Sequence, residues 1–225
     1  MLEEQFLKYP LDFIAHFLLL LPIAVGVYRR ERLTNTLVAV IVYFLIIFVQ
    51  EVVLLVYTLN KVSSIRLQQL LLIIDSLITA EIYYLAFKYK TSYRQIVVVS
   101  LAISLTILII NYLAIPLAFI SSSVHKLTII LFSLMYFNKV LLENRVKNMI
   151  NHAMFWISAG FLLFGMGTFF SSLFIDYLLG DSNELDIAFD LFWGLDQVII
   201  CIQCILAAIG FWVSRYDRAN YLQPV

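Results

Sequence analysis

The stretch Thr36–Leu59 reads TLVAVIVYFLIIFVQEVVLLVYTL and contains one charged residue, Glu51. A helix needs about 20 mostly apolar residues to cross the hydrocarbon core of a bilayer, so this stretch predicts a membrane-spanning helix. Six further stretches meet the same requirement, at about 11–28, 67–87, 96–115, 123–142, 152–175 and 187–214. We therefore expect an all-α fold, a polytopic seven-transmembrane-helix bundle that forms one domain over residues 1–225.

The composition supports a membrane location. Hydrophobic residues make up 63% of the chain and charged residues 13%, and the mean hydropathy is +0.95. Soluble domains have about 45–50% apolar and about 25% charged residues. Only 7 Gly and 4 Pro occur, and no linker-like segment divides the chain. The bilayer is therefore the expected surrounding of the molecule.

Charge and cysteine content argue against other classes of protein. The net charge is zero, and no basic patch suggests binding to nucleic acid. Cys201 and Cys204 lie within an apolar stretch, which predicts free thiols rather than a redox pair. The N-terminal residues lack the basic start and cleavage site of a signal peptide, so the first apolar stretch is expected to remain as a helix.

Basic residues predict the orientation of the bundle. Most of the 15 Lys and Arg residues fall on one side of the predicted spans: Arg29, Arg30, Arg32, Lys88, Lys90, Arg94, Lys139, Arg145, Lys147, Arg215 and Arg218. The other side has Lys8, Lys61, Arg66 and Lys126. Because basic residues concentrate on the cytoplasmic side, we expect the N-terminus outside and the C-terminus in the cytoplasm. The expected location is the cytoplasmic (inner) membrane of a bacterium.

Polar residues within the predicted helices are candidates for a ligand-binding site: His16, Gln50, Glu51, Asp75, Glu81, Asp196 and Gln203. An ionisable side chain in a span costs about 2.5–3.5 kcal/mol on insertion scales, so such residues are often functional. Most of these candidates fall in the outer half of the bundle, and Glu81 lies deeper. We expect a polar, acidic cavity that opens to the outside.

Structural roles remain open for several of these residues. Asp12 and Asp190 are also explained by a position at the membrane interface. His16 is also explained as a packed, hydrogen-bonded side chain, and Glu81 as a hydrogen-bonded acid or a partner of Lys88. In 152–175, Gly167 and Ser171 have the spacing of a close helix-packing face, and Pro22 predicts a kink in the first helix.

Three function classes fit this pattern. An intramembrane metal-dependent hydrolase needs about three protein ligands for a catalytic zinc ion, but His152 is predicted at the opposite end from His16 and His125. A cation- or proton-coupled transporter or channel suits the acids, although the two halves of the chain show no internal repeat. A receptor-like sensor suits an outer polar cavity with short cytoplasmic connections. We expect the sensor, without a metal or another cofactor.

The stretch Phe155–Phe164 reads FWISAGFLLF and is followed by Gly167 and Phe169-Phe170. Together with the segment from Ile205 to Trp212, it resembles small seven-helix membrane proteins of Bacteroidota that accompany, or are fused to, sensor histidine kinases. The resemblance covers the last two predicted helices and implies signalling through a separate partner such as a histidine kinase. A homo-oligomer is a further expectation.

Overall fold

The computed structural model describes residues 10–30, 33–60, 62–88, 90–113, 118–143, 148–178 and 183–220. Its elements, in chain order, are α2 (Pro10–Leu18), α3 (Leu20–Tyr28), α4 (Asn35–Leu59), α5 (Ile65–Ala86), α6 (Thr91–Leu113), α7 (Ala118–Glu143), the 3₁₀ helix η2 (Met149–Asn151), α8 (Ala153–Leu178) and α9 (Asn183–Asn220). Every regular element within these ranges is a helix. The predicted all-α fold is confirmed.

Seven helices in the described part of the chain are long and apolar enough to cross a membrane, with α2 and α3 together forming the first. Large apolar side chains cover the outer surface of these helices; Val99, Ile103 and Ile110 on α6 are 57%, 57% and 60% exposed. Water would penalise such a surface and lipid would not. The chain is therefore a multi-pass integral membrane protein.

The first span is interrupted between α2 and α3, at Leu19. Pro22 explains the position of the break, because its ring lacks an N–H group and collides with the carbonyl group four residues earlier. That residue is Leu18, the last residue of α2. The amide of Leu19 still donates to the carbonyl of Ala15 (3.2 Å), so the two segments remain close to one axis. The predicted kink is thus present as a short break.

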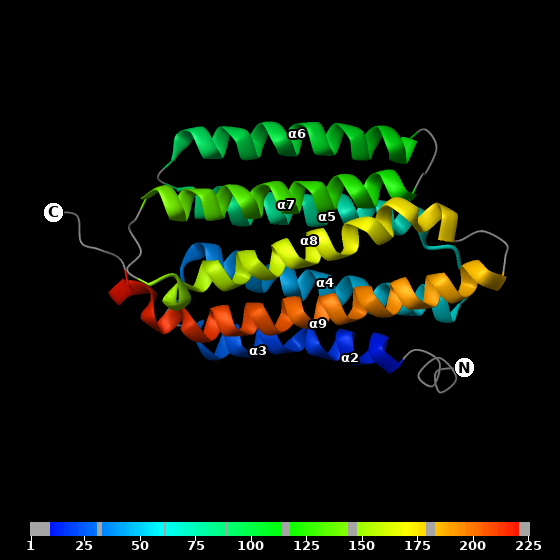
Figure 1. The fold of residues 1–225 in the computed structure, drawn as a ribbon, viewed down its shortest axis with the longest axis horizontal. Coiled ribbons are helices and arrows are strands. Elements are labelled where there is room, and N and C mark those ends of the chain that lie inside the picture. The colour runs from blue at the N-terminus through cyan, green and yellow to red at the C-terminus, as the bar shows by residue number, and fades with distance from the viewer. Residues whose placement is uncertain are drawn as a thin grey trace.

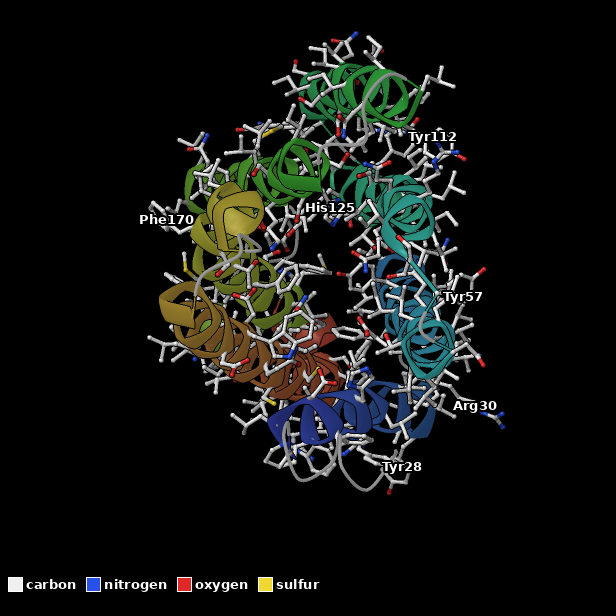
Figure 2. The ribbon with its side chains drawn as sticks, turned by 90° about the vertical axis from the view of Figure 1, so that its right-hand side faces the viewer. Tyr28, Arg30, Tyr57, Tyr112, His125 and Phe170 are labelled. Atoms are coloured by element: carbon white, nitrogen blue, oxygen red, sulfur yellow. The ribbon has the colours of Figure 1, made fainter. Side chains whose placement is uncertain are left out.

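The helices run up and down along the long axis of the molecule, so that α2 begins at one end and α9 finishes at the other (Figure 1). We call these the N-terminal end and the C-terminal end of the bundle. Six spans form a closed ring in the order α2/α3, α4, α5, α7, α8 and α9, and α6 packs outside it against α5 and α7 (Figure 2). The interior of the bundle is the space that this ring encloses.

Aromatic side chains fill the ring in its C-terminal half. Phe44, Phe87, Phe132, Phe161 and Phe211 are at most 1% exposed and belong to one continuous apolar core. Tyr83 contacts the rings of Phe87, Phe132 and Phe161 at centroid separations of 6.2, 5.7 and 6.2 Å, in the range of favourable aromatic pairs. The interior is consequently solid towards the C-terminal end.

The predicted boundary between the fourth and fifth spans was partly wrong. The fifth span was predicted to begin at about Ser123, but α7 already begins at Ala118, so Ser121, Ser122 and Ser123 all lie inside it. The hydroxyl of Ser121 accepts a hydrogen bond from Asn111 Nδ2 (2.6 Å), and that of Ser122 pairs with Ser172 (3.0 Å). Serine side chains near a helix start satisfy either backbone or interhelical partners, so the sequence pattern alone does not separate the two. Pro116 lies outside the described residues.

Candidate functional site

A cavity of about 330 Å³ lies inside the helical ring towards its N-terminal end. Its wall is built from α2, α4, α5, α7, α8 and α9, so every member of the ring contributes. Six of the seven predicted site residues line it: His16, Gln50, Glu51, Asp75, Asp196 and Gln203. In the end-on view of Figure 2, His125 lies on the inner side of the ring, whereas Tyr57, Tyr112 and Phe170 lie on the outside. Whether these residues bind a ligand stays a prediction.

One wall of the cavity joins α2 to α4 through a histidine. The Nδ1 atom of His16 hydrogen-bonds to the backbone carbonyl oxygen of Asp12 (2.5 Å), and its Nε2 atom lies 3.1 Å from Oε2 of Glu51. A protonated ring donates through both nitrogens at once. Asp12 also lines the cavity.

A second contact joins α4 to α5 deeper in the wall. The Nε2 atom of Gln50 donates to Oδ1 of Asp75 at 2.9 Å, and both side chains are buried. Hydrogen bonds to a charged acceptor are stronger than neutral ones, and an unpaired carboxylate in this position would be very costly. This contact holds the Asp75 carboxylate at the cavity surface.

The opposite wall contains two basic residues that sequence reasoning did not place in the site. On α7, His125 Nδ1 lies 2.9 Å from the hydroxyl of Ser76, and Lys126 Nζ donates to the carbonyl oxygen of Thr168 (3.1 Å) and to the hydroxyl of Ser172. Asp196 on α9 is near enough to interact electrostatically with Lys126 and accepts a hydrogen bond from Ser171 (2.9 Å). Lys126 was counted with the outer connections, but its position in α7 brings it into the cavity wall.

Two glutamine side chains in the wall have polar atoms without a hydrogen-bond partner. They are Nε2 and Oε1 of Gln69 and Nε2 of Gln203, in residues that are 3% and 5% exposed. Buried amides are nearly always hydrogen-bonded, so each exception needs an explanation. Gln69 was not predicted; its position near the start of α5 resembles that of an interfacial residue. Gln203 and Asp196 were both predicted as site residues, and both line the cavity.

Glu81 is the predicted residue that the structure does not bring to the cavity. It lies on α5 with its side chain exposed on the outer surface of the ring. Six residues separate it from Asp75, and at 3.6 residues per turn this rotates the side chain by roughly 240° around the helix. Its placement in the cavity was therefore wrong. Asp190 is also exposed and is not part of the lining.

A separate polar cluster lies at the C-terminal end of the bundle. The hydroxyl of Tyr136 pairs with His152 Nε2 (2.5 Å), and His152 Nδ1 lies 2.8 Å from Oδ1 of Asp217. The same carboxylate oxygen accepts the backbone amide of Ala153 (3.1 Å), which ties the end of α9 to the start of α8. Asp217 lies beyond the predicted end of the last span at 214, and sequence analysis did not single it out.

The close packing of α8 is confirmed. A methyl group built at Gly167 would lie 2.7 Å from a side-chain carbon of Ile199, and one at Gly160 would lie 3.3 Å from the carbonyl oxygen of Gln203. Small residues here let α8 approach α9 closely. Cys201 and Cys204 are free thiols, as expected. The described residues bring together no group of three His, Cys, Asp or Glu side chains suited to a metal ion.

The sequence and the fold were compared with known proteins. No model of a protein family, no curated protein sequence and no solved structure matches this chain. The arrangement of its own residues is therefore the basis on which a function can be inferred.

Proposed function

We propose that this protein is a receptor-like membrane sensor, which binds a small ligand in the cavity from outside and signals occupancy to a partner at its cytoplasmic end. In this proposal the N-terminal end of the bundle is the outer end. The observation that carries it is a line of aromatic contacts from the cavity floor to the polar cluster at the other end.

The line begins at Tyr43, which lines the cavity and whose ring contacts Phe161 edge-on at a centroid distance of 5.0 Å. Phe161 contacts Tyr83 at 6.2 Å, and Tyr83 contacts Tyr136 at 6.4 Å. Tyr136 then holds His152 of the C-terminal cluster. Packed rings of this kind change position in discrete steps, because a dense core does not deform continuously.

Charge supports the proposed orientation. Arg29, Arg94 and Arg215 belong to helix ends at the C-terminal end of the bundle, and each guanidinium stacks on an aromatic ring. Arg94 lies 3.8 Å from the Tyr84 centroid, Arg29 lies 4.2 Å from that of Trp212, and Arg215 lies 4.4 Å from that of Tyr216. Basic and aromatic residues together mark a cytoplasmic interface. A partner such as a histidine kinase would contact this end.

The proposal can be tested without knowing the ligand, by filling the cavity covalently. In a chain with Cys201→Ser and Cys204→Ser, the substitution Leu54→Cys puts a thiol in the cavity wall. After reaction with benzyl methanethiosulfonate, amide hydrogen exchange in residues 148–153 should change, because Ala153 is tied to the C-terminal cluster. The matched control is Thr58→Cys, an exposed position one turn along α4 that should give no change. Equal exchange for both labelled variants would refute a coupled receptor.

A transporter is the second candidate, and the Asp75–Gln50 contact favours it. Buried acids within spans often carry protons or cations across a membrane. If a molecule that binds in the cavity is carried into proteoliposomes by the unaltered protein, and Asp75→Asn abolishes this flux, the protein is a transporter and the receptor proposal is wrong. Binding without flux would support the receptor.

A further inference from the structure

The charges around the cavity are unevenly paired. His16 lies beside Glu51 and Asp12, and Lys126 interacts with Asp196. Asp75 differs from these acids: its hydrogen-bond partner is the neutral amide of Gln50, and the charge that acts on it is the like charge of Glu51. Among the described residues, no basic side chain pairs with Asp75. A buried acid without a cation either takes up a proton or accepts a cationic partner, so an ammonium group of a ligand is a suitable partner for Asp75.

The unpartnered amides point in the same direction. The Oε1 atom of Gln69 is a buried acceptor on the same helix as Asp75, and it can take an N–H group of a ligand. The Nε2 atom of Gln203, on α9, is a buried donor. The Gln203 side chain lies against the hydroxyl of Tyr43, which belongs to α4. Besides this contact with the Tyr43 hydroxyl, it can donate to an oxygen or nitrogen acceptor of a ligand. The wall thus presents acceptors for an ammonium group and a donor for a second polar group.

The remaining lining suits an apolar body between these two polar groups. Tyr43, Phe44, Phe164 and Trp193 contribute aromatic rings to the wall, and such rings also attract ammonium groups. The volume of 330 Å³ is at the small end of the range for ligand pockets, about 300–1,000 Å³. A compact molecule with one aromatic ring fits this space.

We infer that the ligand is a small organic amine with an apolar or aromatic body and an oxygen acceptor. Its ammonium group binds Asp75, and its acceptor binds Gln203. This inference rests on the proposed ligand-binding role of the cavity and specifies the chemical class of the ligand.

The test uses purified protein in nanodiscs and three aromatic probes of similar size: tyramine, 2-phenylethanol and 3-phenylpropionate. Tyramine has an ammonium group and an oxygen acceptor, whereas the other two lack the cation. Tyramine should raise the thermal unfolding midpoint in a saturable manner, and the other probes should not. Equal stabilisation by all three, or stabilisation by 3-phenylpropionate alone, would overturn the inference.

Two variants separate binding in the cavity from partition into lipid. Asp75→Asn removes the charge but keeps an oxygen that Gln50 can donate to, so the fold should persist; tyramine affinity should fall roughly 10- to 100-fold, as for loss of a hydrogen bond to a charged group. Glu81→Gln removes a carboxylate from the outer face of the same helix and should bind tyramine as the unaltered protein does. Unchanged affinity in Asp75→Asn would also contradict the inference.

The two experiments fail in different ways. If tyramine does not bind but covalent filling at position 54 still alters residues 148–153, the ligand class is wrong and the receptor proposal stands. If tyramine binds to Asp75 but filling the cavity leaves residues 148–153 unaffected, the ligand class is correct and signalling through the bundle is wrong.

Discussion

The side-chain amide of Gln50 donates to the carboxylate of Asp75 at 2.9 Å, and this contact joins α4 to α5 at a buried point of the cavity wall. The two residues are 25 positions apart in sequence, and each was a candidate on its own helix. Their pairing explains how an acid can persist inside a membrane span. It also leaves the second oxygen of the carboxylate available to a ligand.

We expect the Asp75–Gln50 contact to contribute to stability. Asp75→Ala leaves the Gln50 amide buried without its acceptor, which should cost about 1–3 kcal/mol of unfolding free energy. Asp75→Asn retains an acceptor and should cost less. Thermal unfolding of both variants in the same detergent measures the difference. If the alanine variant were as stable as the asparagine variant, the contact would make no contribution to the stability of the fold.

The Asp217–His152 contact should stabilise the C-terminal end of the bundle against local opening. In Asp217→Ala, both His152 and the amide of Ala153 lose their acceptor, so local opening should become easier by about 1–3 kcal/mol. Amide exchange in residues 148–153 should become faster, while exchange in α4 stays the same. Asp217→Asn provides the control, because its side-chain oxygen can still accept the same hydrogen bonds.

Much of the fold could be predicted because hydrocarbon imposes one dominant rule. Apolar stretches long enough to cross it must be helical, and that rule locates all seven spans from Thr36–Leu59 outward. The same cost argument identified six residues of the cavity wall. The prediction that Glu81 lies in the cavity was based on its depth in the membrane alone. It did not take into account the angle of Glu81 around α5 relative to Asp75.

Other features depend on tertiary contacts that no local pattern encodes. Lys126 looked like a residue of an outer connection, and only the approach of α8 provides the Thr168 carbonyl oxygen that accepts a hydrogen bond from its ammonium group. Asp217 lies beyond the predicted last span, and only the packing of α9 against α8 gives it His152 as a partner. The position of α6 outside the ring likewise follows from packing, since its hydropathy resembles that of the other spans.

Close packing between α8 and α9 gives a prediction with an internal control. A methyl group at Gly210 would lie 2.8 Å from the backbone carbonyl oxygen of Ala153, so Gly210→Ala must push the two helices apart. Overpacking of this kind costs about 1–3 kcal/mol. Gly194 is on the same helix, and a methyl group there would meet nothing within 4 Å. Gly194→Ala should therefore leave the unfolding midpoint unchanged or slightly raised. Equal effects of the two substitutions would mean that the contact at Gly210 relaxes at little cost.

The proposed orientation predicts which end of the bundle meets the outside of the cell. Thr58 is exposed at the N-terminal end, and Tyr28 is 76% exposed at the C-terminal end. In intact cells, a membrane-impermeant charged maleimide should label Thr58→Cys, and it should label Tyr28→Cys only after the membrane is permeabilised. The unaltered chain gives the background, because Cys204 is buried and Cys201 lies within a span. The reverse pattern would place the cavity on the cytoplasmic side, and a ligand would then have to reach it from within the cell.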